Sequence, residues 1–130
     1  VNGESAYITY SSRSAKEEQI ELSIAQVNEQ VEKLGASVRH TGRYPGWDFI
    51  PESELRDTYV KKFKEIMGKD VQTVVIHAGL ECGIIKSRIP DMDIISVGPN
   101  MRNIHTPDEA LQLESCERLF TVLKAVLSNK

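Results

Sequence analysis

Apolar residues recur at steps of three and four in two stretches of the chain, and each stretch predicts a helix with one buried face. In the first stretch, Ser14 and Glu17 form a capping box, and Gly35 can end the helix in the left-handed conformation. The second helix is expected to start after Pro51 and to stop at Gly68. The apolar stripe of the first helix consists of Ile20, Ile24, Val27, Val31 and Leu34. The stripe of the second consists of Leu55, Tyr59, Phe63 and Ile66.

Four segments rich in β-branched, aromatic or other apolar residues predict strands. These segments are residues 5–10, 36–43, 71–76 and 93–97. The last two are almost continuously apolar, which is typical of strands that are covered on both faces. Between them, residues 80–87 have room only for a short helix before Pro90. We therefore expect a parallel β-α-β connection in this part of the chain.

A final helix is predicted close to the end of the chain, and its apolar face is expected to lie against the sheet. That face consists of Cys116, Leu119, Phe120, Leu123, Val126 and Leu127. A turn at Pro45 and Gly46 breaks the pattern and suggests a boundary near residue 47. Residues 1–47 then have the order strand-helix-strand, and residues 48–130 end in β-α-β-α. The pattern predicts the α/β fold class.

The composition argues against some classes of function. The chain has 130 residues, of which 40% are hydrophobic, so it can build a core. Its 16 basic residues are interspersed with 19 acidic ones, which argues against a nucleic-acid partner. No apolar run approaches the roughly 18 residues of a membrane span, and the first residues have neither an initiator Met nor a signal-peptide pattern. We expect a soluble piece of a longer protein, and reduced thiols at Cys82 and Cys116 that suit a cytoplasmic location.

Two polar loops follow predicted strands, in the place where α/β proteins often carry their chemistry. The first is His-Ala-Gly-Leu-Glu-Cys-Gly at residues 77–83, and the second is Gly-Pro-Asn-Met-Arg-Asn-Ile-His-Thr-Pro-Asp-Glu at residues 98–109. Considered locally, His105 is either a surface histidine or a ligand for a metal or substrate. Gly79 is either a turn glycine or a point of close approach to a ligand. Arg13, at a predicted strand end, is either simply exposed or available to bind a carboxylate.

The two loops resemble those of the aminoacyl-histidine dipeptidases, also called Xaa-His or β-alanyl-histidine dipeptidases. These belong to the dinuclear zinc peptidase family that includes carnosinases and aminoacylases. The second loop has every fixed position of the family form Gly-Pro-x-x-Arg-x-x-His-Ser/Thr-Pro-Asp-Glu. In the first, Cys82 stands where carnosinase relatives have a glycine. Because family enzymes run to several hundred residues, the resemblance implies that this chain is a C-terminal fragment.

The resemblance also implies roles for individual residues. His105 would bind one of two zinc ions, Gly79 would line the substrate pocket, and Arg13 would bind the C-terminal carboxylate of a dipeptide. Residues 1–47 would form the second half of a lid domain, and residues 48–130 the C-terminal part of the catalytic domain.

The general base and the other zinc ligands would lie in the N-terminal half of the parent enzyme. No catalytic residue is expected in this chain, which should be inactive alone.

A second hypothesis is a non-catalytic α/β module that binds a partner or supports assembly. An upstream reading frame with metal-binding motifs would favour the dipeptidase over this module. The sequence leaves open the native metal, the preferred N-terminal residue of the substrate, and the oligomeric state, a homodimer included. It also leaves open the roles of His40, His77, Glu81 and Cys82.

Overall fold

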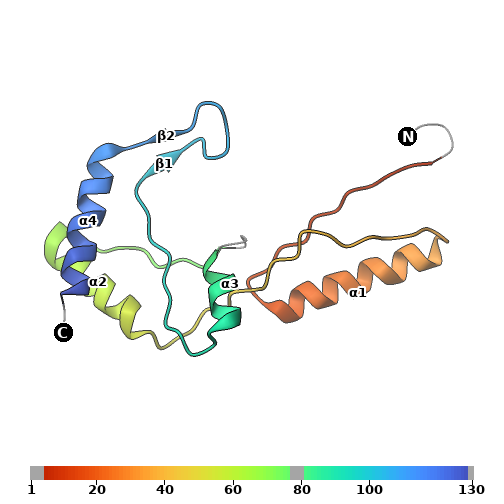
Figure 1. Ribbon diagram of the computed structural model, residues 1–130, viewed down its shortest axis with the longest axis horizontal. Coiled ribbons are helices and arrows are strands. Elements are labelled where there is room, and N and C mark those ends of the chain that lie inside the picture. Colours follow the sequence, from red (N-terminus) through yellow and green to blue (C-terminus); the bar gives the residue numbers. More distant parts are fainter. Residues whose placement is uncertain (1–4, 77–80, 129–130) are drawn as a thin grey trace. The chain divides into compact units, whose positions relative to one another are not determined.

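The computed structural model describes residues 5–76 and 81–128 (Figure 1). This part of the chain contains four helices and one two-stranded sheet, which confirms the predicted α/β class. The elements are α1 (Glu17–Lys33), α2 (Glu54–Met67), α3 (Glu81–Arg88), β1 (Met101–Arg102), β2 (Ala110–Leu111) and α4 (Leu113–Leu127). None of the described helices combines the length and hydrophobicity that crossing a bilayer requires.

The chain divides into two compact units. The first joins the described residues up to Phe49 with the segment Val75–Pro90, and therefore contains α1 and α3. The second joins Ile50–Val74 with the described residues from Asp91 onward, and contains α2, the hairpin and α4. Whether a lid domain ends at residue 47 stays a prediction.

Helix α1 starts differently from the predicted capping box. Its N-cap residue is Lys16, and among the described residues Ser14 Oγ accepts a hydrogen bond only from the Lys16 N–H, at 3.1 Å. The Glu17 carboxylate instead accepts the backbone N–H of Gly46 at 2.7 Å. The capping-box prediction was wrong because a loop distant in sequence competes for the Glu17 side chain. At the other end, Gly35 has a φ of 64°, so the predicted left-handed stop is confirmed.

The four predicted strands carry no ladder in the described part of the chain, where pairing is confined to β1 and β2. A strand is stable only with a hydrogen-bonded neighbour, and the described residues provide none for these segments. The prediction that residues 71–76 are covered on both faces is also not met, since Val74, Val75 and Ile76 are 69%, 51% and 50% exposed. Sequence composition indicates a preference for burial but does not supply the partner.

Helices α2 and α4 pack against each other and form the core of the second unit. Tyr59 from α2 and Val122 and Val126 from α4 are buried in it. The partly buried residues around them are Leu55, Phe63, Met67, Val71, Ile95 and Leu123. Gly68, whose φ is 66°, is the C-cap residue that stops helix α2, as predicted. Its apolar face is slightly rotated from the prediction, since Met67 rather than Ile66 joins the core.

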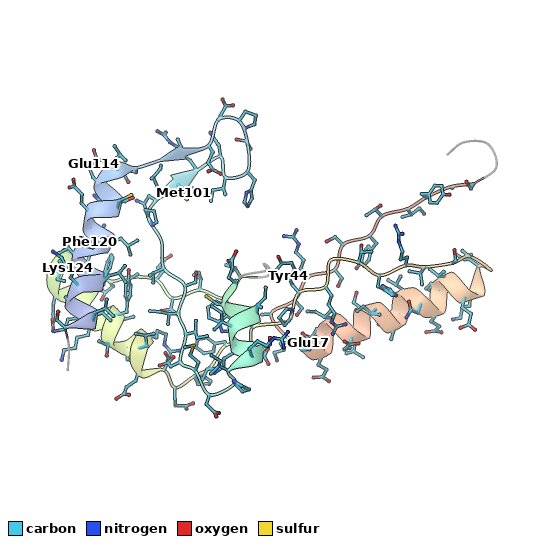
Figure 2. The ribbon with its side chains drawn as sticks, viewed as in Figure 1. Glu17, Tyr44, Met101, Glu114, Phe120 and Lys124 are labelled. Carbon is cyan, nitrogen blue, oxygen red and sulfur yellow. The ribbon has the colours of Figure 1, made fainter. Side chains whose placement is uncertain are left out.

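The buried face of α4 differs from the predicted one. Val122 is completely buried, whereas Phe120 and Leu127 are 62% and 79% exposed. Phe120 instead lies under the Lys124 ammonium, 4.9 Å from its ring centre (Figure 2). We predicted packing on a sheet, but the neighbour is α2. A single helix covers a narrower stripe than a sheet does, which leaves the flanking apolar residues of α4 exposed.

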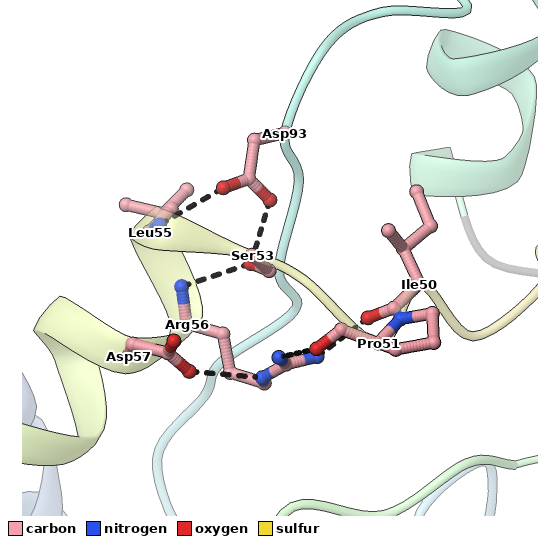
Figure 3. A network of polar contacts seen from close by, with 7 residues as sticks. All are labelled: Ile50, Pro51, Ser53, Leu55, Arg56, Asp57 and Asp93. Atoms are coloured by element: carbon pink, nitrogen blue, oxygen red, sulfur yellow. Dashed lines mark hydrogen bonds and ion pairs between the residues drawn. The ribbon is translucent and has the colours of Figure 1, made fainter.

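A polar network fixes the start of α2 (Figure 3). The Asp93 carboxylate accepts hydrogen bonds from Ser53 Oγ at 2.7 Å and from the backbone N–H of Leu55 at 2.9 Å. Ser53 Oγ accepts the N–H of Arg56 at 3.0 Å, as an N-cap residue should. A carboxylate at a helix N-terminus is also favoured by the helix dipole. The segment that starts at Asp93 is thereby anchored to α2 and runs from there toward the hairpin.

Candidate functional site

The second polar loop forms the tip of the β1-β2 hairpin. The two strands are antiparallel, with Met101 opposite Leu111 and Arg102 opposite Ala110, and residues 103–109 connect them. His105 lies in this connection and is exposed. The hairpin is therefore the element that positions the sequence-predicted metal ligand.

The base of the hairpin is tied to helix α4. The Asn100 N–H donates to Ser115 Oγ at 2.8 Å, and the Gln112 N–H donates to the Asn100 carbonyl at 3.0 Å. The Asn100 side-chain amide also donates to Gln112 Oε1 at 2.9 Å. Ser115 is buried and lies on the same helix as the core residue Val122. The hairpin, and with it His105, is thus connected to the packed pair of α2 and α4.

The loop itself is closed by its own side chains. Asn103 and His105 both have left-handed backbone conformations, with φ of 53° and 66°. The Asn103 carbonyl accepts hydrogen bonds from the N–H and Oγ1 of Thr106, at 3.1 and 2.7 Å. Glu109 accepts the backbone N–H of His105 at 2.8 Å. Left-handed conformations are uncommon outside glycine and persist where the surroundings hold them.

His105 can contribute one ligand to a metal site, but it cannot hold a metal alone. In residues 5–76 and 81–128, no group of three His, Cys, Asp or Glu side chains is placed to bind a metal ion. Zinc sites in proteins use three or four protein ligands. An exposed imidazole on a hydrogen-bonded loop fits the role of one ligand in a site that other residues complete.

Arg13, the predicted carboxylate-binding residue, lies in the other unit, just before α1. Its side chain is exposed, and no hydrogen-bond or ion-pair partner of its guanidinium lies among the described residues. Gly79, the predicted pocket residue, lies outside the described residues, as does His77. The structure therefore locates two of the three predicted site residues, one in each unit.

Helix α3 packs closely on the Pro45–Trp47 turn within the first unit. Gly83 is buried there, and a Cβ at this position would lie 3.2 Å from the Pro45 carbonyl oxygen. A Cβ on Gly46 would lie only 2.6 Å from the Ala15 carbonyl oxygen, so position 46 requires glycine, whereas a side chain at position 83 would make a tight contact. The turn thus lies between the start of α1 and α3, and Gly83, which contacts it, directly follows Glu81 and Cys82 in sequence.

Three residues whose roles were open can now be placed. His40 Nε2 is 2.7 Å from Asn28 Oδ1, which joins the segment after α1 to that helix. Glu81 lies in the first turn of α3, where a negative charge is favoured by the helix dipole. Cys82 is a partly buried free cysteine in the same turn. None of these contacts assigns chemistry to the three residues.

The network that connects α1 to the Pro45–Trp47 turn was not predicted. The Arg43 guanidinium pairs with the carboxylates of Glu17 and Glu21 (Figure 2 labels Glu17). The hydrogen bond from Gly46 N–H is the main reason that the pKa of Glu17 lies below its usual value, and Arg43 lowers this pKa further against the opposing effect of desolvation. Residues four apart on a helix lie on the same face, so the spacing of Glu17 and Glu21 could have indicated a shared cation.

A shallow hollow of about 620 Å³ lies beside the hairpin base. The two strands and the start of α4 line it, with Arg102 and Glu114 as its charged residues (Figure 2 labels Met101 and Glu114). Arg102 is the fixed arginine of the second loop motif. The arginine is therefore the last residue of β1, directly before the connection that carries His105.

Comparison with known proteins assigns this chain to a peptidase family. The family model described as peptidase family M20/M25/M40 matches residues 6–129, nearly the whole chain, and the chain belongs to this family. The chain is 36% identical over 93 residues to the cytosol non-specific dipeptidase of Escherichia coli (strain K12). That match covers 72% of this chain and 19% of the relative.

A comparison with solved structures also finds a dipeptidase. The aminoacylhistidine dipeptidase from Vibrio alginolyticus superimposes with a TM-score of 0.73 at 31% sequence identity, over 88% of this chain and 23% of that one. The chain thus spans about a fifth of the length of these relatives. The family resemblance read from the two loops is confirmed.

Proposed function

We propose that this chain is part of a cytoplasmic zinc-dependent dipeptidase that hydrolyses Xaa-His dipeptides. The observation that carries the proposal is His105, exposed at the tip of a hydrogen-bonded hairpin in a chain of the M20/M25/M40 peptidase family. The names of the two relatives, both dipeptidases, support the reaction class. In this proposal, the remaining ligands and the general base belong to other parts of the parent protein, and the absence of a three-ligand group in residues 5–76 and 81–128 is compatible with it.

In this proposal, His105 binds one of two zinc ions through its neutral imidazole. When bound, zinc supplies Lewis-acid polarisation of the scissile carbonyl and a water whose pKa is lowered toward neutrality. The hairpin fixes the position of His105, because hydrogen bonds join its base to α4 and side-chain hydrogen bonds close its tip. Rigid support of this kind keeps a ligand in the geometry that a metal requires.

Arg13 is proposed to bind the carboxylate of the dipeptide, with Gly79 lining the pocket. Two observations support the arginine: it is exposed, and no partner within the described residues occupies its guanidinium. A planar guanidinium matches the two oxygens of a carboxylate with two parallel hydrogen bonds. The role of Gly79 is proposed from the sequence alone. Residues 1–47 would belong to a lid and residues 48–130 to the catalytic domain.

The test uses the full-length protein that contains this chain. We expect it to hydrolyse β-alanyl-histidine, to lose activity on treatment with a chelator and to recover it with zinc. His105→Ala should lower zinc content by one ion per subunit and reduce turnover at least about 10- to 100-fold, the loss typical of weaker changes around a metal. Retention of two zinc ions by this variant would remove the assignment of His105. A full-length protein that hydrolyses no dipeptide would favour a non-catalytic binding or assembly module instead.

A further inference from the structure

His105 has an unusual backbone conformation, and its N–H is hydrogen-bonded to a glutamate of the same loop. With a φ of 66°, His105 occupies a region of backbone space that a non-glycine residue seldom adopts. Its N–H then donates to Oε2 of Glu109, at 2.8 Å. Since the direction of the Cα–Cβ bond follows from the backbone conformation, whatever holds this φ also aims the imidazole.

We propose that Glu109 is a positioning residue that holds His105 in the orientation needed to bind a metal. The inference rests on the proposed function, in which His105 is a metal ligand. Glu109 is well placed for this task because it directly precedes β2 and its own N–H donates to the Thr106 carbonyl at 3.1 Å. Ala110, the next residue, is paired with Arg102 of β1. The carboxylate therefore extends from a backbone that the hairpin already fixes.

The other hydrogen bonds of the loop do not involve His105. Asn103 is held through its side-chain amide, which donates to the Asp108 carbonyl at 3.3 Å, and Thr106 bonds to Asn103. These bonds join the two ends of the loop but do not reach His105. In the described part of the chain, the hydrogen bond to Glu109 is the one that holds His105 itself. Removing it frees the backbone at the residue that bears the ligand.

The experiment compares Glu109→Ala, Glu109→Gln and His105→Ala in the full-length protein, with Glu117→Ala as the matched control. Glu117 is an exposed glutamate on α4 whose carboxylate makes no hydrogen bond or ion pair with the described residues. The readout is the zinc dissociation constant, measured with a competing chelator, and the number of zinc ions per subunit. Circular dichroism and the melting temperature report whether each variant is folded.

A positioning role predicts a graded series. Glu109→Ala should weaken zinc binding about 10- to 100-fold, as expected for loss of a group that orients a metal ligand. Glu109→Gln replaces the carboxylate by an amide, whose oxygen can still accept the His105 N–H, so this variant should recover most of the loss. Glu117→Ala should bind zinc as the unmodified protein does. The rescue by glutamine is a result that a general loss of stability would not produce.

Three results would overturn the inference. Equal losses in Glu109→Gln and Glu109→Ala would mean that the charge itself matters, so that Glu109 would be a ligand rather than a positioning residue. Unchanged zinc affinity in Glu109→Ala, together with loss in His105→Ala, would remove the inference and leave the proposed function intact. Unchanged zinc affinity in His105→Ala would remove the proposed function, and the inference with it.

Discussion

At the scale of single residues, the arginine at position 13 allows a direct test of substrate recognition. If its guanidinium pairs with the dipeptide carboxylate in a closed site, Arg13→Ala leaves that charge unpaired. Loss of one partner of a buried charge pair costs about 2–5 kcal/mol, which corresponds to about 30-fold or more in kcat/KM. Arg13→Lys should restore only part of the rate, because an ammonium cannot form two parallel hydrogen bonds. Steady-state kinetics of the full-length protein measure both variants.

A substrate without the carboxylate provides the control. A dipeptide amide should already be a poor substrate, and Arg13→Ala should slow its hydrolysis little further. Equal slowing of acid and amide would mean that Arg13 supports the structure near α1 and does not contact the carboxylate.

The sequence was sufficient to predict the family, whereas the roles of Arg13, Gly79 and His105 stay predictions. The spacing of Arg102, His105 and Glu109 in the second loop identified the family, and family membership follows from the match to residues 6–129. What the sequence could not provide is which partner each side chain selects. Glu17 has the spacing of a capping box, yet its carboxylate bonds to Gly46. Competition between local and distant hydrogen-bond donors is decided by the fold, so it cannot be read from spacing.

At the scale of elements, the contact between α1 and the Pro45–Trp47 turn should depend on pH. The pKa of Glu17 is lowered from 4.5, first by the Gly46 hydrogen bond. A carboxyl with a lowered pKa in the folded protein contributes stability above its unfolded pKa and loses it as the pH falls through the folded value. We therefore expect the hydrogen bond to be intact at neutral pH and to weaken below about pH 4.5. The NMR chemical shift of the Gly46 amide, followed through an acid titration, measures this change.

Glu17→Gln is the control for this titration. Glutamine does not ionise, so the Gly46 amide should show no transition in the acid range in that variant. If the same transition persisted, its source would be another group, and the assignment of the pH effect to Glu17 would fail.

The pairing of α2 and α4 makes a prediction about stability. Val122 is completely buried between these helices, so Val122→Ala removes two methyl groups from the core. At about 0.8 kcal/mol for each buried carbon, plus the cost of the cavity, we expect a loss of about 2–3 kcal/mol in the free energy of unfolding. Urea denaturation measures it. The control is Thr121→Ala, which changes the exposed residue directly before Val122 on α4. It should change the free energy of unfolding by less than about 0.5 kcal/mol.

Helices were easier to predict than strands for a physical reason. A helix forms its hydrogen bonds within one segment, so α2 and α3 and the stop at Gly68 follow from local sequence. A strand forms its hydrogen bonds with another segment. Residues 71–76 and 93–97 have the composition of buried strands, but no ladder partner lies among the described residues. The buried face of α4 was misjudged for the same reason, since it depends on the neighbour.

At the scale of the whole molecule, the exposed apolar segments are consistent with a chain that spans 19% and 23% of its two relatives. Val74, Val75 and Ile76 form an apolar run that is at least half exposed. We expect the rest of the parent protein to supply the strands that pair with this run. The same reasoning applies to the site, because one imidazole needs further ligands from elsewhere.

This dependence on the rest of the parent predicts that the isolated 130-residue chain has no dipeptidase activity, even with added zinc. His105 is one ligand, and no group of three metal-binding side chains exists in residues 5–76 and 81–128 to complete a site. One neutral imidazole cannot hold zinc in the geometry that activates a water. The assay follows release of histidine from β-alanyl-histidine by the purified chain, with the full-length protein as the positive control. Hydrolysis by the purified chain that a chelator abolishes would show that the chain contains a complete metal site, and the division of the catalytic groups proposed above would be wrong.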